Sequence, residues 1–422
     1  MSSKSITRAI LICMVLGIIV GYFCNTFAAD ADTAKMISGY FGVVADIFLR
    51  LIKMIIAPLV FATLVSGIAH MGDTKAIGRI GLKAMLWFVS ASFVSLLIGL
   101  IMVNILRPGD NLNLPLPDVN AATNLKASAL NLKDFITHLV PRSAVEAMAT
   151  NEILQIVVFS IFFGVAAGAL GDKAKLVVHG IEEFAHVILK VTGYVMNAAP
   201  VAVFAAMAGI VTTQGLGILV TYGKFMLYFY LSIAVLWGCM AIAGYLVLGN
   251  GVVRLFQLIR EPFLLAFSTA SSEAAYPVTM EQLSKYPMTQ KIISFVLPLG
   301  YSFNLDGSMM YCTFAVIFIA QAYNIELSLA QEITMLLVLM LTSKGMAGVP
   351  RASLVVIAAT LNQFNIPEAG LLLIIGIDQF LDMGRSATNV LGNSLATAAV
   401  SKWEGELHAA ADDFAEVRAE PA

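Results

Sequence analysis

The feature that most constrains this chain is a series of apolar stretches, each long enough to cross a lipid bilayer. A transmembrane helix needs about 20 predominantly apolar residues. Soluble domains are about 25% charged, whereas this chain of 422 residues is only 12% charged and 59% hydrophobic. The composition therefore excludes an ordinary soluble enzyme and predicts a polytopic membrane protein. The first six stretches are residues 6–28, 40–70, 80–106, 153–170, 179–211 and 218–248.

The positions of Lys and Arg predict how these segments are oriented in the membrane. The first stretch resembles a signal peptide, but its apolar run over 9–27 is too long for a signal core, so we expect a retained helix. Lys and Arg residues gather in alternate connections, which the positive-inside rule assigns to the cytoplasm. Helical spans rather than barrel strands indicate a bacterial cytoplasmic (inner) membrane, with both termini cytoplasmic. The net charge of −2 gives no reason to expect a nucleic-acid partner. The orienting residues are Lys4, Arg8, Lys75, Arg79, Lys83, Lys173, Lys175, Arg254 and Arg260.

Two later apolar segments, 256–290 and 327–365, are interrupted near their middles. The interruptions at 268–277 and 342–351 are rich in Ser, Gly, Ala and Pro, and each flanking arm is too short to span. Irregular backbone survives at membrane depth only where protein or a cavity surrounds it. Paired broken segments point to a transport site. We predict two re-entrant hairpins, followed by spans at 292–323 and 367–401: an all-α fold of eight transmembrane helices with inverted repeats.

The last predicted helix carries a polar stripe. Spacings of 4, 3, 4 and 4 residues place its members along one helical face. A charge at the bilayer centre costs about 2.5–3.5 kcal/mol, so these side chains are expected to face a polar interior. The planar Arg side chain suits a carboxylate ligand and a nearby Asp suits an ammonium. An internal ion pair is the alternative. The stripe consists of Asp378, Asp382, Arg385, Asn389 and Asn393.

Two further motifs place polar groups in apolar surroundings. Residues 304–308, Asn-Leu-Asp-Gly-Ser, interrupt the seventh span, where Asn304 and Asp306 offer oxygen ligands for a monovalent cation. A kinked helix with a capped Asp is the alternative there. At the first hairpin break, Ser271 and Ser272 offer hydroxyls beside Glu273, a candidate proton carrier. Alternatively, Glu273 pairs with Lys344 or Arg351 near the second break.

Together, the segments 268–277, 304–308, 343–350 and 378–393 resemble the dicarboxylate/amino acid:cation symporter family, or glutamate transporters, and most closely its bacterial proton/glutamate symport proteins. The resemblance covers nearly the whole chain. It implies a homotrimer in which a scaffold supports a transport domain that moves like an elevator. The implied scaffold is 1–78 and 151–215, and the implied transport domain comprises helix 79–108, helix 216–250, hairpin 251–290, helix 291–325, hairpin 326–366 and helix 367–402. Residues 109–150 and 403–422 would be an extracytoplasmic loop and a cytoplasmic tail.

The resemblance also implies a substrate site. Arg385 would bind the side-chain carboxylate of L-glutamate or L-aspartate, Asp382 the amino group, and Asn389 the main-chain carboxylate. Family members that carry succinate or malate usually lack an Asp at position 382, so we expect an acidic amino acid, with a C4-dicarboxylate (succinate, fumarate or malate) as the alternative. The full set of expected substrate-binding residues is Ser271, Ser272, Ser308, Gly348, Val349, Ser353, Asp382, Arg385, Ser386 and Asn389.

Departures from the sodium-coupled family pattern favour proton coupling. Asn393 stands where sodium-coupled members have a carboxylate, and Phe88 and Ala91 replace two oxygen-bearing side chains. The Glu that carries the proton in animal relatives would fall at Cys312, so the carrier is expected to be Glu273, Asp306 or, third, Asp378. Sodium coupling, with Na⁺ at Asn304, Asp306 and Asn389, is the alternative. The expected coupling set is Ser92, Glu273, Ser302, Asn304, Asp306, Ser343, Lys344, Asp378 and Asn393.

Other classes fit less well. A Ser272–Lys344 hydrolase dyad is the one enzyme that the sequence suggests, but there is no G-x-S-x-G motif and no metal-ligand cluster. We therefore expect no enzymatic activity and no cofactor other than the coupling ion. A channel is the second rival, and accumulation of solute against a gradient distinguishes a symporter from it.

Overall fold

The computed structural model describes residues 3–71, 74–110, 137, 139–216, 222–342, 352–375 and 377–407. Within these ranges the chain is almost entirely helical, and its one pairing of extended backbone is an isolated bridge between Met288 and Leu407. Six described helical segments are long and apolar enough to cross a bilayer, which confirms the all-α polytopic membrane fold. They are Arg8–Phe27, Ala31–Ala69, Lys75–Leu106, Ile153–Met196, Gly223–Leu248 and Gln290–Ala322.

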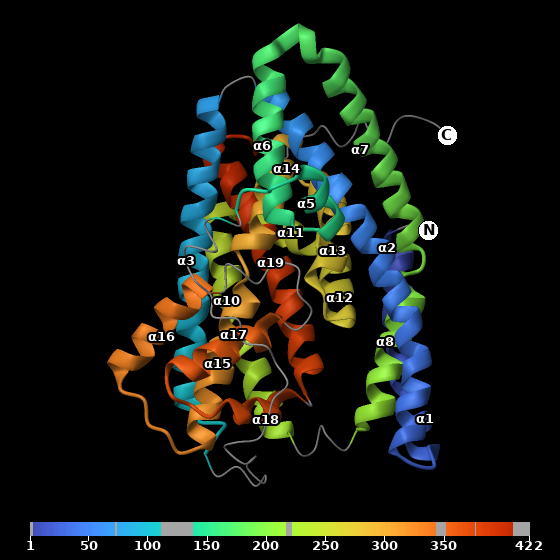
Figure 1. Ribbon diagram of the computed structural model, residues 1–422, viewed down its shortest axis with the longest axis vertical. Helices are drawn as coiled ribbons and strands as arrows, with labels where there is room; N and C mark the ends of the chain where they lie inside the picture. The colour runs from blue at the N-terminus through green and yellow to red at the C-terminus, as the bar shows by residue number, and fades with distance from the viewer. Residues whose placement is uncertain are drawn as a thin grey trace.

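The first half of the chain forms long helices, most of them on one side of the molecule (Figure 1). Helix α1 packs lengthwise on α8, while α2 packs on α6, α7 and α8. Their bounds are α1 Ser3–Phe27, α2 Ala31–Met71, α3 Thr74–Leu106, α5 Ala144–Thr150, α6 Ile153–Leu170, the short 3₁₀ turn η1 Gly171–Ala174, α7 Lys175–Met196 and α8 Ala199–Gln214.

Small residues allow α1 to approach α8 closely. A Cβ atom on Gly17 would lie 2.6 Å from the carbonyl oxygen of Phe204, closer than real Cβ atoms approach a backbone oxygen. The two helices are also joined by a hydrogen bond from Asn25 Nδ2 to the carbonyl of Thr212 at 2.8 Å. Glycine at such an interface lets two backbones meet, which is a common way for helices to associate in a membrane.

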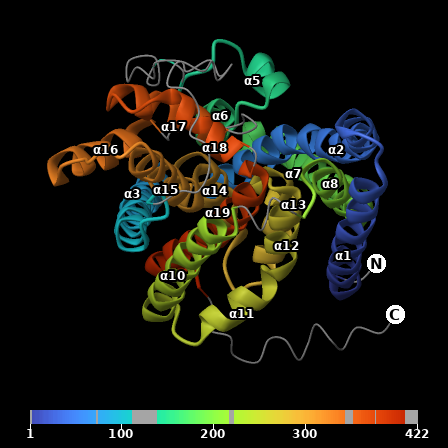
Figure 2. The same cartoon turned by 90° about the horizontal axis from the view of Figure 1, so that it is seen from below.

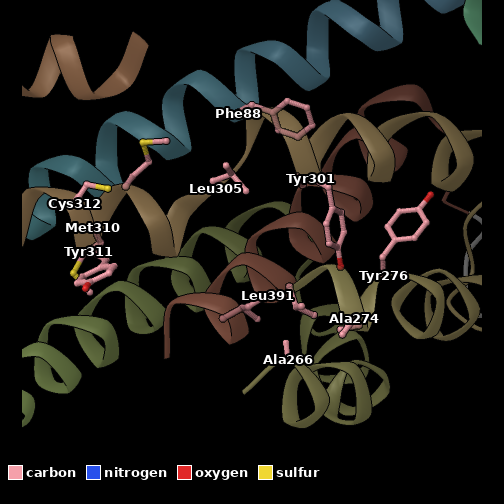
Figure 3. Packing of buried hydrophobic residues seen from close by; sticks show 14 of the residues in the cluster. Phe88, Ala266, Ala274, Tyr276, Tyr301, Leu305, Met310, Tyr311, Cys312 and Leu391 are labelled. Carbon is pink, nitrogen blue, oxygen red and sulfur yellow. The ribbon is translucent and has the colours of Figure 1, made fainter. Parts of the chain in front are cut away.

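The second half surrounds α19, which lies near the middle of the molecule in the view of Figure 2. Helix α19 packs against α3, α10, α12, α13, α14 and α15. Large side chains such as Phe88, Tyr301 and Leu391 fill the space between these helices (Figure 3). The bounds are α10 Gly223–Leu248, α11 Gly251–Leu258, α12 Arg260–Thr269, α13 Ser272–Ser284, α14 Gln290–Phe303, α15 Asp306–Ala322, α16 Leu329–Thr342, α17 Ala352–Gln363, η3 Glu368–Leu371, α18 Leu372–Ile375 and α19 Asp378–Glu404.

Two expected spans differ in the structure. The span 367–401 begins with the short elements η3 and α18, and its long helix α19 starts only at Asp378. Residues 179–211, expected as a single helix, are divided because α7 ends at Met196 and α8 begins at Ala199. Pro200 lies in the first turn of α8, where proline suits a helix start because its missing N–H needs no partner there. The resulting α8 has 16 residues and is not among the six segments long enough to span.

The interruptions also lie close to where the sequence places them. In the first hairpin segment, α12 ends at Thr269, Ala270 has a left-handed backbone (φ 51°), and α13 follows. In the seventh span, α14 ends at Phe303 and α15 begins at Asp306, so the break at 304–305 is confirmed. The second hairpin break, 343–351, lies outside the described residues. The re-entrant character of both hairpins and the domain limits remain predictions.

Ion pairs and a ring contact join the end of α19 to the start of α3. Arg79 Nη2 donates to Glu404 Oε2 at 2.7 Å, and Lys83 Nζ lies 2.7 Å from Glu404 Oε1. The rings of Trp87 and Trp403 meet edge to face with centroids 5.5 Å apart. The hydrogen bond from Arg79 and the charge of Lys83 hold the pKa of Glu404 below its usual value.

We expect Glu404→Gln to lower the melting temperature by about 1–2 °C at neutral pH. The Glu404 side chain is 3% exposed but Arg79 is 57% exposed, and an ion pair open to solvent on one side contributes about 1 kcal/mol. Because the folded pKa is lowered, this stabilisation is present above the ordinary glutamate pKa of about 4.3 and is lost as the pH falls through the folded value. Thermal unfolding in detergent at pH 7 and at about pH 3 measures the effect. The matched control is Glu281→Gln, which breaks the exposed pair with Lys285. An equal effect of Glu404→Gln at both pH values would contradict the prediction.

Candidate substrate and cation site

The polar stripe of the last helix lies in the interior of the protein. Asp378, Asp382, Asn389 and Asn393 are all buried on α19, and the Arg385 side chain is only 14% exposed. Helical spacing brings these side chains to one face, and that face packs on α15, whose residues from Asp306 to Ala320 are all buried. The structure therefore brings together charged and amide groups in the buried interior of the molecule.

Arg385 is held in place by two neighbours. Its Nε donates to Asp382 Oδ1 at 2.6 Å, and its Nη1 donates to Ser308 Oγ at 3.0 Å. The internal ion pair that the sequence allowed is thus present, with Asp382 as the partner. A guanidinium fixed at two of its nitrogens is oriented in advance, and its planar fork matches a carboxylate. Asp382 thereby has a structural role as well as its expected role toward an ammonium.

Asn389 connects α19 to the first turn of α15. Its Oδ1 accepts hydrogen bonds from the backbone N–H groups of Gly307 and Ser308, at 2.9 and 3.4 Å, and its Nδ2 donates to Ser308 Oγ at 3.2 Å. The two helices meet here so closely that a Cβ on Gly307 would collide with the carbonyl oxygen of Arg385. Only glycine fits at this crossing. Ser308 is consequently shared between Arg385 and Asn389, which fixes both side chains relative to α15.

The break between α14 and α15 carries a buried carboxylate. Asn304 Nδ2 donates to Asp306 Oδ2 at 3.1 Å, and Ser95 Oγ on α3 donates to Asp306 Oδ1 at 3.4 Å. Gly392 on α19 packs directly against the same carboxylate, where any larger residue would clash with Asp306. Asp306 is fully buried, as are Ser92 and Phe88 on the neighbouring α3.

Several buried oxygen and nitrogen atoms near this break have no hydrogen-bond partner among the described residues. They include Asn304 Oδ1 and both amide atoms of Asn393. The hydroxyl oxygen of Ser302, near the end of α14, also belongs to this set. Gly300 on α14 packs against the Asn393 amide, and Gly392 packs against Asn304, so α14 and α19 bring the two asparagines to one place. An unsatisfied buried polar group costs about 1–3 kcal/mol, and such groups in native proteins mark sites for an ion or a water molecule. This neutral oxygen set fits a monovalent cation or water.

The first hairpin break adjoins the same region. Ala270 and Phe267 pack on Phe380 and Met383 of α19, next to Asp382 and Arg385 in sequence. Ser271 begins α13 as its N-cap, and its Oγ accepts a hydrogen bond from the N–H of Ala274 at 3.2 Å. Ser271 therefore caps α13, a role in addition to the expected one of substrate binding. Ser272 is buried and Glu273 is half-buried in the first turn of α13.

Two polar contacts of α15 join segments far apart in the sequence, which residue spacing does not reveal. The hydroxyl of Tyr311 donates to Asp378 Oδ1 at 2.7 Å. The thiol of Cys312 lies 3.9 Å from the carbonyl oxygen of Ser353, which links α15 to the start of α17. A buried tyrosine hydroxyl normally needs a partner, so Tyr311 in an apolar run was the available signal.

The remaining expected residues divide into two groups. Ser353 and Ser386 are buried, and neither hydroxyl oxygen has a hydrogen-bond partner in the described parts of the chain. Ser343, Lys344, Gly348 and Val349 lie outside the described residues, so their assigned roles stay predictions.

Comparison with known proteins places this arrangement in a family. Residues 6–403 match the model of the sodium:dicarboxylate symporter family. A protein from Anaeromyxobacter sp. (strain K) is 39% identical over 411 residues, covering 96% of this chain and 91% of its own length. A protein from Laribacter hongkongensis is 39% identical over 419 residues, covering 96% and 92%. A protein from Pseudomonas savastanoi pv. phaseolicola is 39% identical over 414 residues, covering 96% and 87%. Each is named C4-dicarboxylate transport protein.

Proposed function

We propose that this chain, which belongs to the sodium:dicarboxylate symporter family, is a secondary active symporter that carries a four-carbon dicarboxylate together with cations. The chain is a transporter and not an enzyme. The observation that carries the proposal is the oriented Arg385, a buried guanidinium with five N–H donors, of which Asp382 and Ser308 accept two. We propose that one substrate carboxylate binds there.

The relatives' names support a C4-dicarboxylate better than the acidic amino acid that the sequence led us to expect. The contact between Asp382 and Arg385 is consistent with this substrate class. Because Asp382 Oδ1 accepts from Arg385 Nε, Asp382 can orient the guanidinium without receiving an ammonium group from the substrate. A dicarboxylate without an amine leaves that ion pair in place.

An acidic amino acid remains the second candidate, and Asp382 is the specific observation that favours it. A carboxylate has about four acceptor sites, so Asp382 can hold Arg385 and also accept from an ammonium. L-aspartate meets both requirements, since it is a four-carbon dicarboxylate with an amino group. L-glutamate is one methylene longer.

Asp382→Asn separates these substrates. The substitution removes the negative charge but keeps a carboxamide oxygen that can accept from Arg385 Nε. We therefore expect competition by succinate for labelled succinate uptake to change by less than about threefold. Competition by L-aspartate should weaken by roughly tenfold or more, because a hydrogen bond to a charged group contributes about 1.5–3 kcal/mol. If the unaltered protein prefers L-aspartate or L-glutamate to succinate and Asp382→Asn abolishes uptake of the amino acid, the dicarboxylate proposal is wrong.

We propose protons as the coupling ions, with sodium as the alternative. Three neutral or apolar side chains, Asn393, Ala91 and Phe88, stand where the sodium-coupled pattern has oxygen ligands, and this leaves Asp306 as the buried carboxylate of the break. Asp306 is fully buried whereas Glu273 is half-buried, so we place Asp306 first as proton carrier. The amide oxygens of Asn304 and Asn393, which have no hydrogen-bond partner among the described residues, would bind water in this case, or Na⁺ in the alternative.

The assembly and the location are proposals that rest on the sequence resemblance. We propose a homotrimer with an elevator-type transport domain in a bacterial inner membrane, with both termini in the cytoplasm. Crosslinking of the purified protein in lipid nanodiscs tests the trimer, and a band pattern that ends at the dimer would contradict it.

A further inference from the structure

A crevice between α3 and α10 reaches α19 at Gly392, about two helical turns beyond Arg385. Its volume is about 220 Å³. Most of its wall is apolar and comes from three helices, and its residues include Trp87, Val94, Leu236, Met240, Ala243 and Leu395. An apolar wall of this kind holds a hydrocarbon body better than it holds the polar substrate of the transporter.

One carboxylate lies at the lining of the otherwise mostly apolar crevice. Asp306 lines it, together with Ser95, whose Oγ donates to Asp306 Oδ1, and Gly392, which packs on the same carboxylate. Asp306 itself is fully buried. An apolar cleft that ends at a carboxylate is complementary to a molecule with a hydrocarbon body and a cationic head.

The crevice is positioned to receive its ligand from the bilayer. It lies between α3 and α10, two of the segments that are long and apolar enough to span. Its α3 residues lie between positions 87 and 95, near the middle of the span, and Val94 is 44% exposed there. A molecule that enters at this depth must first dissolve in hydrocarbon, which excludes ordinary water-soluble ions as occupants.

We propose that this crevice is a binding site for small lipophilic amines, whose ammonium group pairs with Asp306 and whose hydrocarbon body fills the apolar wall. A cavity of about 150 Å³ holds benzene, so a volume of about 220 Å³ fits a body of roughly nine or ten carbons. A charge pair in these surroundings is stronger than in water, and the amine avoids the cost of an unpaired buried charge.

Binding can be measured without transport because Trp87 lines the crevice. The purified protein in lipid nanodiscs is titrated with aminoadamantane while tryptophan emission is recorded. We expect a saturable change that is lost in Trp87→Phe and in Ala243→Phe, which fills the crevice. The matched control is Ala234→Phe, an exposed position on α10 outside the crevice, which should keep the response.

The role of the charge is tested by the neutral analogue adamantanol, which has the same hydrocarbon body. We expect the amine to bind at least roughly tenfold more tightly than the alcohol. Asp306→Asn should remove this preference but keep the response to the alcohol, which also shows that the variant is folded. Equal affinities for the amine and the alcohol in the unaltered protein, or an undiminished response in Ala243→Phe, would overturn the proposal.

One consequence of the proposal depends on the proposed function. If Asp306 takes part in coupling, aminoadamantane should inhibit uptake in the unaltered protein and in Ala234→Phe but not in Ala243→Phe. Binding without inhibition would leave the site in place and contradict only the role of Asp306 in transport. The two proposals therefore fail separately.

Discussion

Replacing Arg385 with Lys is expected to weaken substrate binding by roughly 100-fold or more. Lysine keeps the positive charge but presents a single ammonium, so it cannot bond Asp382 and Ser308 and also offer a planar fork to a substrate carboxylate. Loss of one or two charged hydrogen bonds costs about 1.5–3 kcal/mol each, and about 2.7 kcal/mol corresponds to 100-fold. Competition by unlabelled succinate for labelled succinate uptake at low concentrations measures the affinity.

The matched control is Arg79→Lys, which makes the same substitution at the exposed end of α3. That variant should retain uptake within about threefold, because lysine keeps the positive charge beside Glu404 and the Arg79 side chain is 57% exposed. Thermal unfolding of both variants shows whether they remain folded. A folded Arg385→Lys protein with unchanged affinity for every dicarboxylate and acidic amino acid would exclude Arg385 as the substrate anchor.

Replacing Asp306 with Asn is expected to abolish accumulation driven by a pH gradient while leaving substrate exchange in place. Asparagine has nearly the same shape as a protonated aspartic acid and fits beside Ser95 and Asn304, but it cannot release a proton. A gradient of one pH unit drives at most roughly tenfold accumulation for each coupled proton. Net uptake should therefore fall to the equilibrium level, whereas exchange of labelled for unlabelled succinate at equal pH should continue.

Glu273→Gln is the matched comparison, because it neutralises the other candidate carboxylate by the same change. Glu273 is half-buried in the first turn of α13, so we expect this variant to keep its response to the pH gradient. The opposite pattern, loss in Glu273→Gln and retention in Asp306→Asn, would make Glu273 the carrier. Retention in both variants would direct attention to Asp378, which accepts from Tyr311.

Local periodicity in the sequence was sufficient for much of the fold. The apolar stretches define the long helices, and the Asn-Leu pair before Asp306 marks the break between α14 and α15. The division of residues 179–211 at 197–198 was missed, because hydropathy is high on both sides of the break. Pro200 was the available signal, since proline favours the first turn of a helix.

The candidate site could be predicted only in part. Spacings of three and four residues placed Asp382, Arg385 and Asn389 on one face of a helix, because that pattern depends on a single element. The bonds from Asn389 to the first turn of α15 join segments 81 or 82 residues apart, and periodicity carries no information about such contacts. The capping role of Ser271 and the pair of Tyr311 with Asp378 depend in the same way on how segments pack.

The most direct test of the central claim is uptake of labelled succinate by proteoliposomes that contain only this protein. An inward proton gradient is imposed without sodium, and then a sodium gradient at equal pH. We predict accumulation of succinate above the outside concentration with the proton gradient, and no accumulation without a gradient. Equilibration without accumulation under both gradients would contradict symport. Accumulation that requires sodium would instead reject proton coupling while leaving the proposed substrate site intact.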